Sequence, residues 1–485
     1  MTDWMSLPVE TWVEILHFVR SSSTRDLADL CLTCSDLSSI ARPVLYNDLT
    51  LYTTTPECEP NLSAQTTLAL LARDEALSRS VRRLTLNGAQ DSELDINDAA
   101  ILAHIASLRN MKQLMCLKII GAVFLYAAED LKAEYVQVLA GLPLEELSLP
   151  FPGCFPDFSE QHFAQFANLK SIDCYTDVDH HEYFKLPCLR LLSNSATTLT
   201  SLSLSAMYID DWSLEVFALR FPLLRALTIG TWDEEIHTPA GFNDFILAHH
   251  ETLEYLALGY TERREICAAA LVFGDGLSPH ILPNLREFKG HCQNIEMMAR
   301  ACMRCLGNTF TKVTVGASRI GDPMGAINTM LDALQTYRLC ALKELDFDLF
   351  CWDFDEREAV PDFIRRWGAI CGASLEVWRG RVPFVWTWST EELAGFFAAF
   401  AKMRVLWIAH DSTVFGVYPR MELEEEDDED EPVPEVDFEA YLRALAESCP
   451  SLDEVWVMWG HKDVCWRIER GSGPSNAKLN VRLIH

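Results

Sequence analysis

The chain has few basic residues for its size, and this shortage excludes one large class of partner. Its 485 residues include 40 lysines and arginines against 71 aspartates and glutamates, a formal net charge of −31. A surface of this sign repels phosphate groups over most of its area. We therefore expect no nucleic-acid partner.

Long apolar runs are also missing. The longest, such as Cys267 to Phe273, are far shorter than the roughly 20 residues that cross a bilayer. No charged stretch followed by an apolar core marks a secretory signal, so we expect neither secretion nor a membrane partner. The 16 cysteines are scattered and form no disulfide framework. This distribution favours a reducing compartment, the cytoplasm or the nucleus.

No group of residues has the spacing of a catalytic or metal site. Two cysteine pairs, 31/34 and 302/305, have zinc-site spacing, but each lies on a predicted helix among apolar residues. We interpret them as buried thiols. The histidine pairs at 180–181 and 249–250 lack a third ligand, so we assign them structural or surface roles. A glycine-rich phosphate loop is absent. We expect no enzymatic activity, no metal and no cofactor.

What the chain does have is a recurring apolar triplet. An apolar residue is followed, in most cases, by others three and five positions later, and the pattern returns thirteen times from residue 81 onward. The intervals run from 25 to 33 residues, except for a last interval of 49. Such regular spacing indicates a repeat architecture. The triplets begin at Val81, Leu114, Leu144, Leu169, Leu199, Leu224, Leu253, Leu285, Phe310, Leu342, Leu375, Met403 and Leu452.

Between the triplets the apolar spacing changes to three or four residues, as on one face of a helix. Clear examples lie within 324–337, 393–400 and 438–445. Prolines such as Pro187 and Pro222 then interrupt the helix before the next strand. The predicted unit is a strand, a loop, a helix and a second loop, although residues 186–198 fit no register.

This unit resembles that of leucine-rich-repeat proteins of the longer, helix-containing type. The resemblance covers residues 81–485 in a degenerate form, without most of the asparagines that follow the strand. It implies an α/β solenoid that is curved, with parallel strands on the concave face and helices on the convex face.

The longest interval contains a strongly acidic run. Nine of the ten residues from Glu422 to Glu431 are acidic, and like charges at this density repel one another and remain solvated. We expect a disordered insertion at about 420–437 within one repeat. Two roles stay open for it: a solvated surface loop, or a patch for a basic partner.

The first 52 residues have a different pattern, that of three short helices and a strand. Pro8 suits a helical first turn, and an apolar stripe of Val9, Trp12, Val13 and Leu16 follows. Asp26 is the expected N-cap of a second helix. We expect a third helix over residues 35–41, ended by Pro43, and a strand over 45–51 that caps the first repeat. Residues 53–80 are expected to be a linker or capping segment.

Four motifs in this block occur in a fixed order. They are Leu7-Pro8-x-Glu10, Ile15-Leu16, Asp26-Leu27-x-x-Leu30-x-x-x-Cys34 and Pro43-x-Leu45-Tyr46-x-x-Leu49-x-Leu51. Together they resemble the F-box, in the form common among fungal F-box proteins, although Leu37 stands where many F-boxes have tryptophan.

The F-box resemblance implies that residues 1–52 dock on a Skp-type adaptor and, through it, on a cullin of a ubiquitin ligase. It implies apolar contacts by Leu7, Pro8, Ile15, Leu16, Leu27 and Leu30, while Glu10 and Cys34 match further family positions. A capping subdomain that packs on the first repeat is the alternative.

A client would be held by side chains that alternate with the apolar triplets, because these point to the exposed face of the strands. They are small in early repeats but charged or aromatic near the C-terminus. Tryptophan and arginine dominate binding hot spots. The candidates are Asp346, Asp348, Arg379, Arg381, Trp407 and Trp456. Alternatively, the tryptophans of this region mostly fill the repeat cores, with Trp378 facing inward.

The function that these patterns favour is substrate recognition within a Skp–cullin–F-box ubiquitin ligase, for a client that the sequence does not name. The alternative is an acidic repeat scaffold that binds basic proteins and has no part in ubiquitination.

Overall fold

The chain divides into two compact units, Met1–Leu224 and Arg225–His485. The computed structural model describes residues 7–52, 64–87, 98–120, 129–151, 163, 165–176, 181–206, 210–231, 240–258, 282–306, 309–316, 323–336, 339–348, 360–384, 388–410, 438–459, 462–469 and 480–483. The acidic insertion expected at about 420–437 lies outside these residues. In the described part of the chain, every helix is too short or too polar to cross a bilayer.

The first unit begins with a block of three helices, α1 (Val9–Ser22), α2 (Thr24–Cys31) and α3 (Ser35–Tyr46). We call these residues, together with Leu7 and Pro8, the helical block. Its core consists of Leu16, Leu27, Ala41 and Val44. Burying these four side chains from three different helices stabilises the block, since none of the helices is long enough to be stable alone.

Two details of the helical block correct the expectations from the sequence. Ser23 is the N-cap of α2, and its hydroxyl accepts a hydrogen bond from the Asp26 N–H at 3.1 Å. Asp26 therefore lies within the helix. Pro43 does not end α3, which continues to Tyr46. Burial of Val44 in the core holds this last turn in place despite the proline.

Arg20 of α1 links the helical block to the first strand, β1 (Asp48–Tyr52). Its guanidinium donates to the Val44 carbonyl at 3.0 Å and to the Asp48 carbonyl. β1 pairs in parallel with β2 (Arg83–Asn87). The segment expected as a linker contains α4 (Ala64–Arg73) and α5 (Glu75–Ser78), and α4 packs against α6 (Asp98–Asn110). The first repeat thus begins at β1, earlier than the sequence indicated.

The remaining elements of the first unit are strands and helices in turn, except that β5 directly follows β4 among the described elements. The strands β1 to β6 pair in parallel with their neighbours in chain order. The elements after α6 are β3 (Cys116–Ile120), α7 (Glu129–Ala140), β4 (Glu146–Phe151), β5 (Ser171–Thr176), α9 (His181–Ser195), β6 (Ser201–Ala206) and α10 (Asp210–Ala218).

Residues 186–198, which fitted no register, form most of α9 and the turn after it. Pro187 lies inside this helix, which corrects the expectation of a break there. Buried Cys188, Leu191 and Leu192 hold the helix against the core beyond the proline.

The second unit is also built from strands and helices, but its last two strands have the opposite direction. Its strands pair in parallel from β7 to β14, and the last two add in antiparallel fashion. The elements are β7 (Ala226–Thr231), α11 (Phe242–His249), β8 (Tyr255–Leu258), β9 (Glu287–His291), α12 (Cys292–Leu306), β10 (Lys312–Gly316), α13 (Pro323–Thr336), β11 (Glu344–Asp348), α14 (Val360–Cys371), β12 (Val377–Phe384), α15 (Thr390–Phe397), β13 (Val405–His410), α16 (Phe438–Ser448), β14 (Glu454–Trp459), β15 (Lys462–Glu469) and β16 (Asn480–Leu483).

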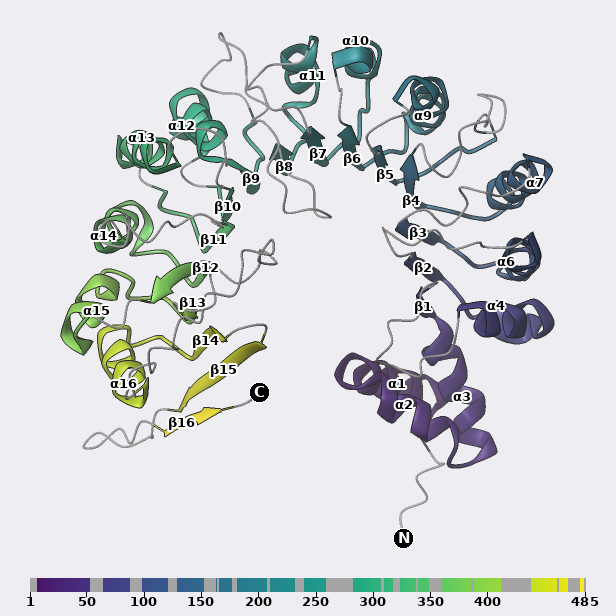
Figure 1. Cartoon of the computed structure of the whole chain (residues 1–485), viewed down its shortest axis with the longest axis horizontal. Coiled ribbons are helices and arrows are strands. Elements are labelled where there is room, and N and C mark those ends of the chain that lie inside the picture. The colour runs from purple at the N-terminus through teal and green to yellow at the C-terminus, as the bar shows by residue number, and fades with distance from the viewer. Residues whose placement is uncertain are drawn as a thin grey trace, which may run out of the picture. The chain divides into compact units, whose positions relative to one another are not determined.

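The thirteen apolar triplets correspond to the strands β2 to β14, each of which begins two residues after the start of a triplet. Triplet side chains such as Leu342, Leu345 and Phe347 are buried. In Figure 1 the helices of each unit lie along one side of its strands. Parallel strands in chain order, with helices on one side, are the arrangement of a leucine-rich-repeat-like solenoid. The predicted repeat of parallel strands with helices on one side is therefore confirmed.

Candidate functional site

The structure separates the predicted adaptor-binding residues into surface and core positions. Leu7, Pro8, Glu10, Ile15 and Cys34 are exposed and Leu30 is half-buried, whereas Leu16 and Leu27 are fully buried. The last two side chains form the core of the helical block, so in this structure they stabilise the block and cannot reach a partner. This corrects their assignment as contacts.

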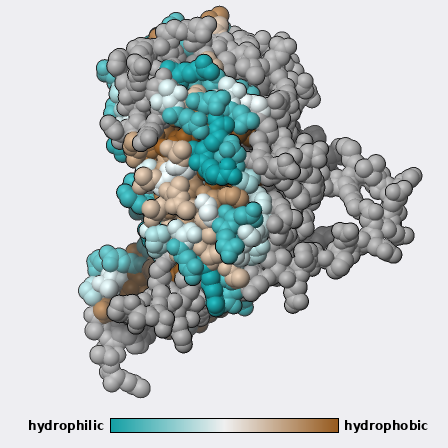
Figure 2. Space-filling view, turned by 90° about the vertical axis from the view of Figure 1, so that its left-hand side faces the viewer, coloured by the Kyte–Doolittle hydropathy of each residue, from teal (hydrophilic) through white to brown (hydrophobic). Residues whose placement is uncertain are grey.

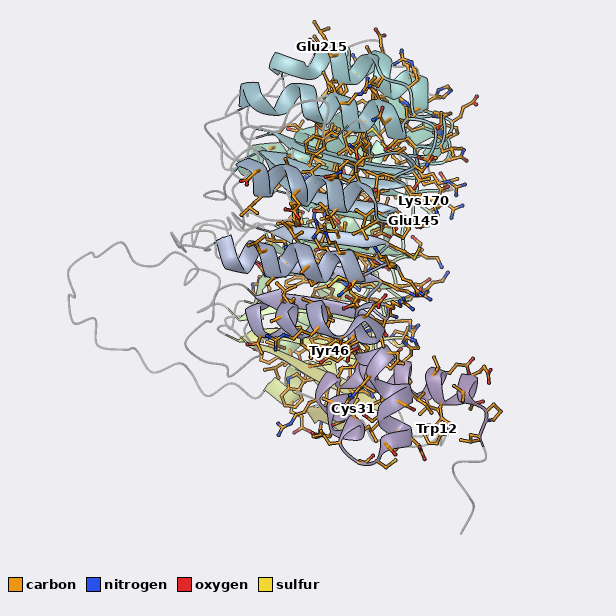
Figure 3. All side chains as sticks on the ribbon, turned by 90° about the vertical axis from the view of Figure 1, so that its right-hand side faces the viewer. Trp12, Cys31, Tyr46, Glu145, Lys170 and Glu215 are labelled. Carbon is orange, nitrogen blue, oxygen red and sulfur yellow. The ribbon has the colours of Figure 1, made fainter. Side chains whose placement is uncertain are left out.

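Three further apolar residues of the helical block lie at the surface. Val9 is 57% exposed, Phe18 73% and Leu32 82%. Val9 was expected to belong to the apolar stripe of this helix, but it is the first residue of α1 and its side chain is largely exposed. Phe18 follows Ile15 by three positions, which places both on the same side of α1. That spacing could have identified Phe18 from the sequence. Figure 3 shows the helical block with Trp12, Cys31 and Tyr46 labelled.

The predicted client-binding residues come together in pairs on the exposed face of the second unit. Asp346 of β11 lies in register with Arg379 of β12. Trp407 of β13 lies in register with Trp456 of β14, and their rings stack at 5.0 Å with an angle of 14°. Asp348 and Arg381 lie on β11 and β12, but their side chains are outside the described residues.

A β-bulge separates the two pairs. The register between β12 and β13 shifts after Trp378, so residues 379–381 together lie opposite Trp407. Gly380 takes φ 153° at this point, and a Cβ there would come within 2.7 Å of the Phe347 Cβ. The bulge therefore requires glycine, and it lengthens the stretch of β12 that carries Arg379.

The tryptophans of this region divide between core and surface. Trp367 and Trp378 are fully buried, and Trp378 packs at 5.3 Å from both Phe347 and Phe400. The expectation that Trp378 faces inward is confirmed. Trp407 and Trp456 remain half-buried on the opposite face. Trp367 and Trp378 thus fill the core, and a binding role for Trp407 and Trp456 stays a prediction.

Charge on this face is balanced, although the whole chain is strongly acidic. Lys312 lies between Glu287 at 4.0 Å and Glu344 at 3.6 Å, and Arg467 pairs with Glu454 at 3.1 Å. Among the described side chains of the exposed face of β7 to β15, acidic and basic residues are equal in number. They are Glu287, Glu344, Asp346 and Glu454 against Lys289, Lys312, Arg379 and Arg467. The described side chains of this face therefore show no acidic excess that would favour a basic partner.

A second group of charges lies at the residue immediately before some of the strands. The backbone N–H of this residue donates to the carbonyl of its counterpart in the previous repeat, as from Lys170 to Glu145 at 2.7 Å. The side chains of the same two residues form an ion pair at 2.7 Å (Figure 3). Exposed pairs of this kind contribute little to stability. These ion pairs were not predicted from the sequence. The other such pairs are Arg225–Glu254 at 3.3 Å, Lys343–Glu376 at 3.1 Å and Arg404–Asp453 at 2.9 Å.

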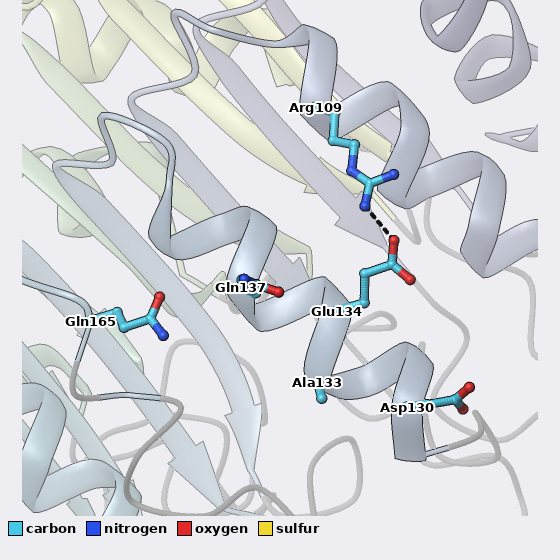
Figure 4. A pocket seen from close by; sticks show the side chains of 6 residues that line it. All are labelled: Arg109, Asp130, Ala133, Glu134, Gln137 and Gln165. Atoms are coloured by element: carbon cyan, nitrogen blue, oxygen red, sulfur yellow. Dashed lines mark hydrogen bonds and ion pairs between the residues drawn. The ribbon is translucent and has the colours of Figure 1, made fainter.

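Figure 2 shows the side of the second unit on which α13 to α15 lie, where hydrophilic side chains cover much of the surface and hydrophobic ones show between them. In the first unit, a pocket near α6 and α7 is lined by Arg109, Asp130, Ala133, Glu134, Gln137 and Gln165 (Figure 4). Arg109 holds the Glu134 carboxylate in an ion pair. This lining contains no serine, cysteine or histidine that could act as a nucleophile with a base.

The cysteine and histidine pairs take different positions. Cys31 is half-buried and Cys34 is exposed, because Cys34 precedes α3 in the turn between two helices. This corrects the interpretation of the 31/34 pair as buried thiols. His249 is buried, with Nδ1 at 2.7 Å from the Phe245 carbonyl, a structural role as expected. The other two pairs lie outside the described side chains. Where the structure describes side chains, no three metal-binding residues converge.

Comparisons with known proteins give structural likenesses at low identity. No family model matches the chain, and no curated protein does. The crystal structure of the Rad7 and Elc1 complex from yeast is similar at 15% identity and a TM-score of 0.41, covering 95% of this chain and 90% of that one. The leucine-rich-repeat-containing protein LegL7 from Legionella pneumophila is similar at 12% identity and a TM-score of 0.32, covering 83% of this chain and 100% of that one. The fold assignment rests on the strand order and register described above.

Proposed function

We propose that this protein is the substrate-recognition subunit of a Skp–cullin–F-box ubiquitin ligase in the cytoplasm or nucleus. The helical block binds the adaptor, and the exposed face of the repeats holds a client protein. The chain contributes no catalytic residue; it raises the concentration of the client near the ubiquitin-transferring subunits.

The observation that carries this proposal is the apolar surface of the helical block. Its core is complete with Leu16, Leu27, Ala41 and Val44, yet Leu7, Ile15 and Phe18 remain exposed on α1 or beside it. Apolar side chains left outside a complete core gain free energy when a partner covers them. The resemblance of this block to the F-box, in motifs that include Leu7 and Ile15, supports a Skp-type adaptor as that partner.

Direct binding of the purified full-length chain to a Skp-type adaptor, measured by calorimetry, tests the proposal. The double substitution Leu7→Asp/Ile15→Asp places two carboxylates on the apolar surface and leaves the core intact. We expect at least tenfold weaker binding, which is about 1.4 kcal/mol. In cells, the same variant should lose adaptor and cullin on affinity purification.

Leu70→Asp is the matched control, because Leu70 is an equally exposed leucine on α4, outside the helical block. It should bind the adaptor as the unmodified chain does. Failure of the unmodified chain to bind any Skp-type adaptor would refute the proposal, as would full binding by a folded double variant.

A further inference from the structure

The exposed face of β12 to β14 carries a continuous apolar patch. Val377 lies in register with Val405, which is two residues before Trp407 on the same face of β13. Trp407 in turn stacks on Trp456. We call Val377, Val405, Trp407 and Trp456 the tryptophan patch. The corresponding positions of β4 to β6 carry polar residues only, namely Glu146, Ser148, Ser171, Asp173, Ser201 and Ser203.

The borders of the tryptophan patch are charged, and most of these charges are already paired. The Glu454–Arg467 pair, at 3.1 Å, lies on the β15 side. On the β11 side, Glu344 is held by Lys312 at 3.6 Å. An apolar centre with a polar border is typical of protein interfaces, and stacked tryptophans are frequent anchors in them.

Arg379 is the exception to this pairing. It is exposed, and among the described residues it has neither a hydrogen bond nor an ion pair. It follows Val377 by two positions and lies opposite Trp407 in the bulge. Arg379 thus stands at the edge of the tryptophan patch. An arginine in this state favours an anion, which it can bind through two parallel hydrogen bonds.

Among the described side chains, those around Arg379 favour an anion with a single charge. Asp346 lies next to it in register on β11, and this carboxylate offsets part of the positive potential. A phosphate group carries nearly two negative charges at neutral pH and usually requires several cations. A side-chain carboxylate requires one arginine only.

We propose that the tryptophan patch and Arg379 bind a client segment in which an aromatic or large aliphatic residue stands next to an aspartate or glutamate. The apolar side chain covers Trp407 and Trp456, and the neighbouring carboxylate pairs with Arg379. The role of this segment as a ligase client rests on the proposed function; the binding itself does not depend on it.

Selection of peptides from a random-peptide library on the immobilised full-length chain tests this inference. The enriched peptides should combine an aromatic or aliphatic residue with a neighbouring acidic one. Arg379→Glu should shift the enrichment to lysine and arginine at that place. Trp407→Ala/Trp456→Ala should bind the original peptides at least tenfold more weakly. Arg286→Glu makes the same charge change at an exposed site of the same unit, and it should keep the original selection.

An enriched peptide is then synthesised with glutamate, phosphoserine or lysine at the acidic place. The glutamate form should bind as tightly as any, and the lysine form least. Tenfold tighter binding of the phosphoserine form, a preference for lysine, or enrichment that survives loss of both tryptophans would overturn the inference. Adaptor binding is measured on the same proteins, so a failure of the proposed function is seen separately.

Discussion

Burial sets the protonation state of several single residues in this fold. His104 of α6 is buried against Tyr135 of α7, with ring centroids 5.2 Å apart. Desolvation lowers the pKa of His104 to about 3, so this side chain is neutral at physiological pH. Burial likewise raises the pKa of the Cys292 thiol to about 12, and it also raises that of Cys371. These cysteines behave as small apolar residues at neutral pH.

The low pKa of His104 predicts a specific loss of stability in acid. The unfolded chain takes up this proton near pH 6.5, and the folded chain does so only near pH 3. The contribution of neutral, buried His104 to the free energy of unfolding is therefore complete above pH 6.5 and falls as the pH drops below that value. The free energy of unfolding should decrease by about 1.4 kcal/mol per pH unit through this one group.

His104→Phe retains a ring against Tyr135 and removes the titration. Urea unfolding at pH 7 and pH 5 should show a smaller acid loss for this variant than for the unmodified chain. His17→Gln is the control, because it removes a histidine that is exposed on α1. Equal pH dependence in all three proteins would contradict the account of His104.

At the scale of elements, the bulge in β12 decides which of its residues lie opposite Trp407 of β13. In a regular strand, a single residue of β12 would lie opposite Trp407. The shift of register adds residues to β12 alone, and such bulges are frequent beside functional sites. Arg379 and the stacked tryptophans are held next to each other by this irregularity.

Two glycines of neighbouring elements should respond to alanine in opposite ways. Gly380→Ala places a Cβ 2.7 Å from the Phe347 Cβ at φ 153°, so it should destabilise by about 2–3 kcal/mol. Gly395 lies in α15 with no atom within 4 Å of an added Cβ. Gly395→Ala should therefore stabilise by roughly 0.5–1 kcal/mol, through helix propensity alone. Denaturant unfolding measures both, and a neutral Gly380→Ala would refute the strained bulge.

At the scale of the whole molecule, a repeat array must protect the strands at its ends, because an open edge pairs with other chains. β15 and β16 cover β14 in the second unit by antiparallel pairing. Cys465 and Ile468 of β15 are buried, and the Ile468 N–H donates to the Asp453 carbonyl at 2.8 Å. These strands therefore close the parallel repeats at this end.

Removal of residues 462–485 should expose the edge of β14 together with the apolar side chains beneath β15. We expect a lower melting temperature and self-association, detected by size-exclusion chromatography with light scattering. Deletion of residues 484–485 alone leaves β16 complete and should change neither property. A monomeric and equally stable chain after the longer deletion would show that β15 and β16 do not act as a cap.

The thirteen repeat strands were predictable because their signal is local. A strand such as β11 carries its triplet Leu342, Leu345 and Phe347 within six residues, and the spacing of triplets repeats along the chain. Helices such as α13 follow from an apolar period of three to four residues. β15 and β16 could not be found in this way, since they have no triplet and form only by pairing on β14.

The candidate sites depended more on tertiary structure. The sequence determined the helical block, the repeats and the alternation that points Arg379, Trp407 and Trp456 away from the core. It did not determine that Leu16 and Leu27 are buried while Ile15 and Phe18 are exposed, because this depends on how three helices pack. The stacking of Trp407 on Trp456 was equally hidden from the sequence. These two residues are brought together by strand register, across an interval of 49 residues that no local pattern spans.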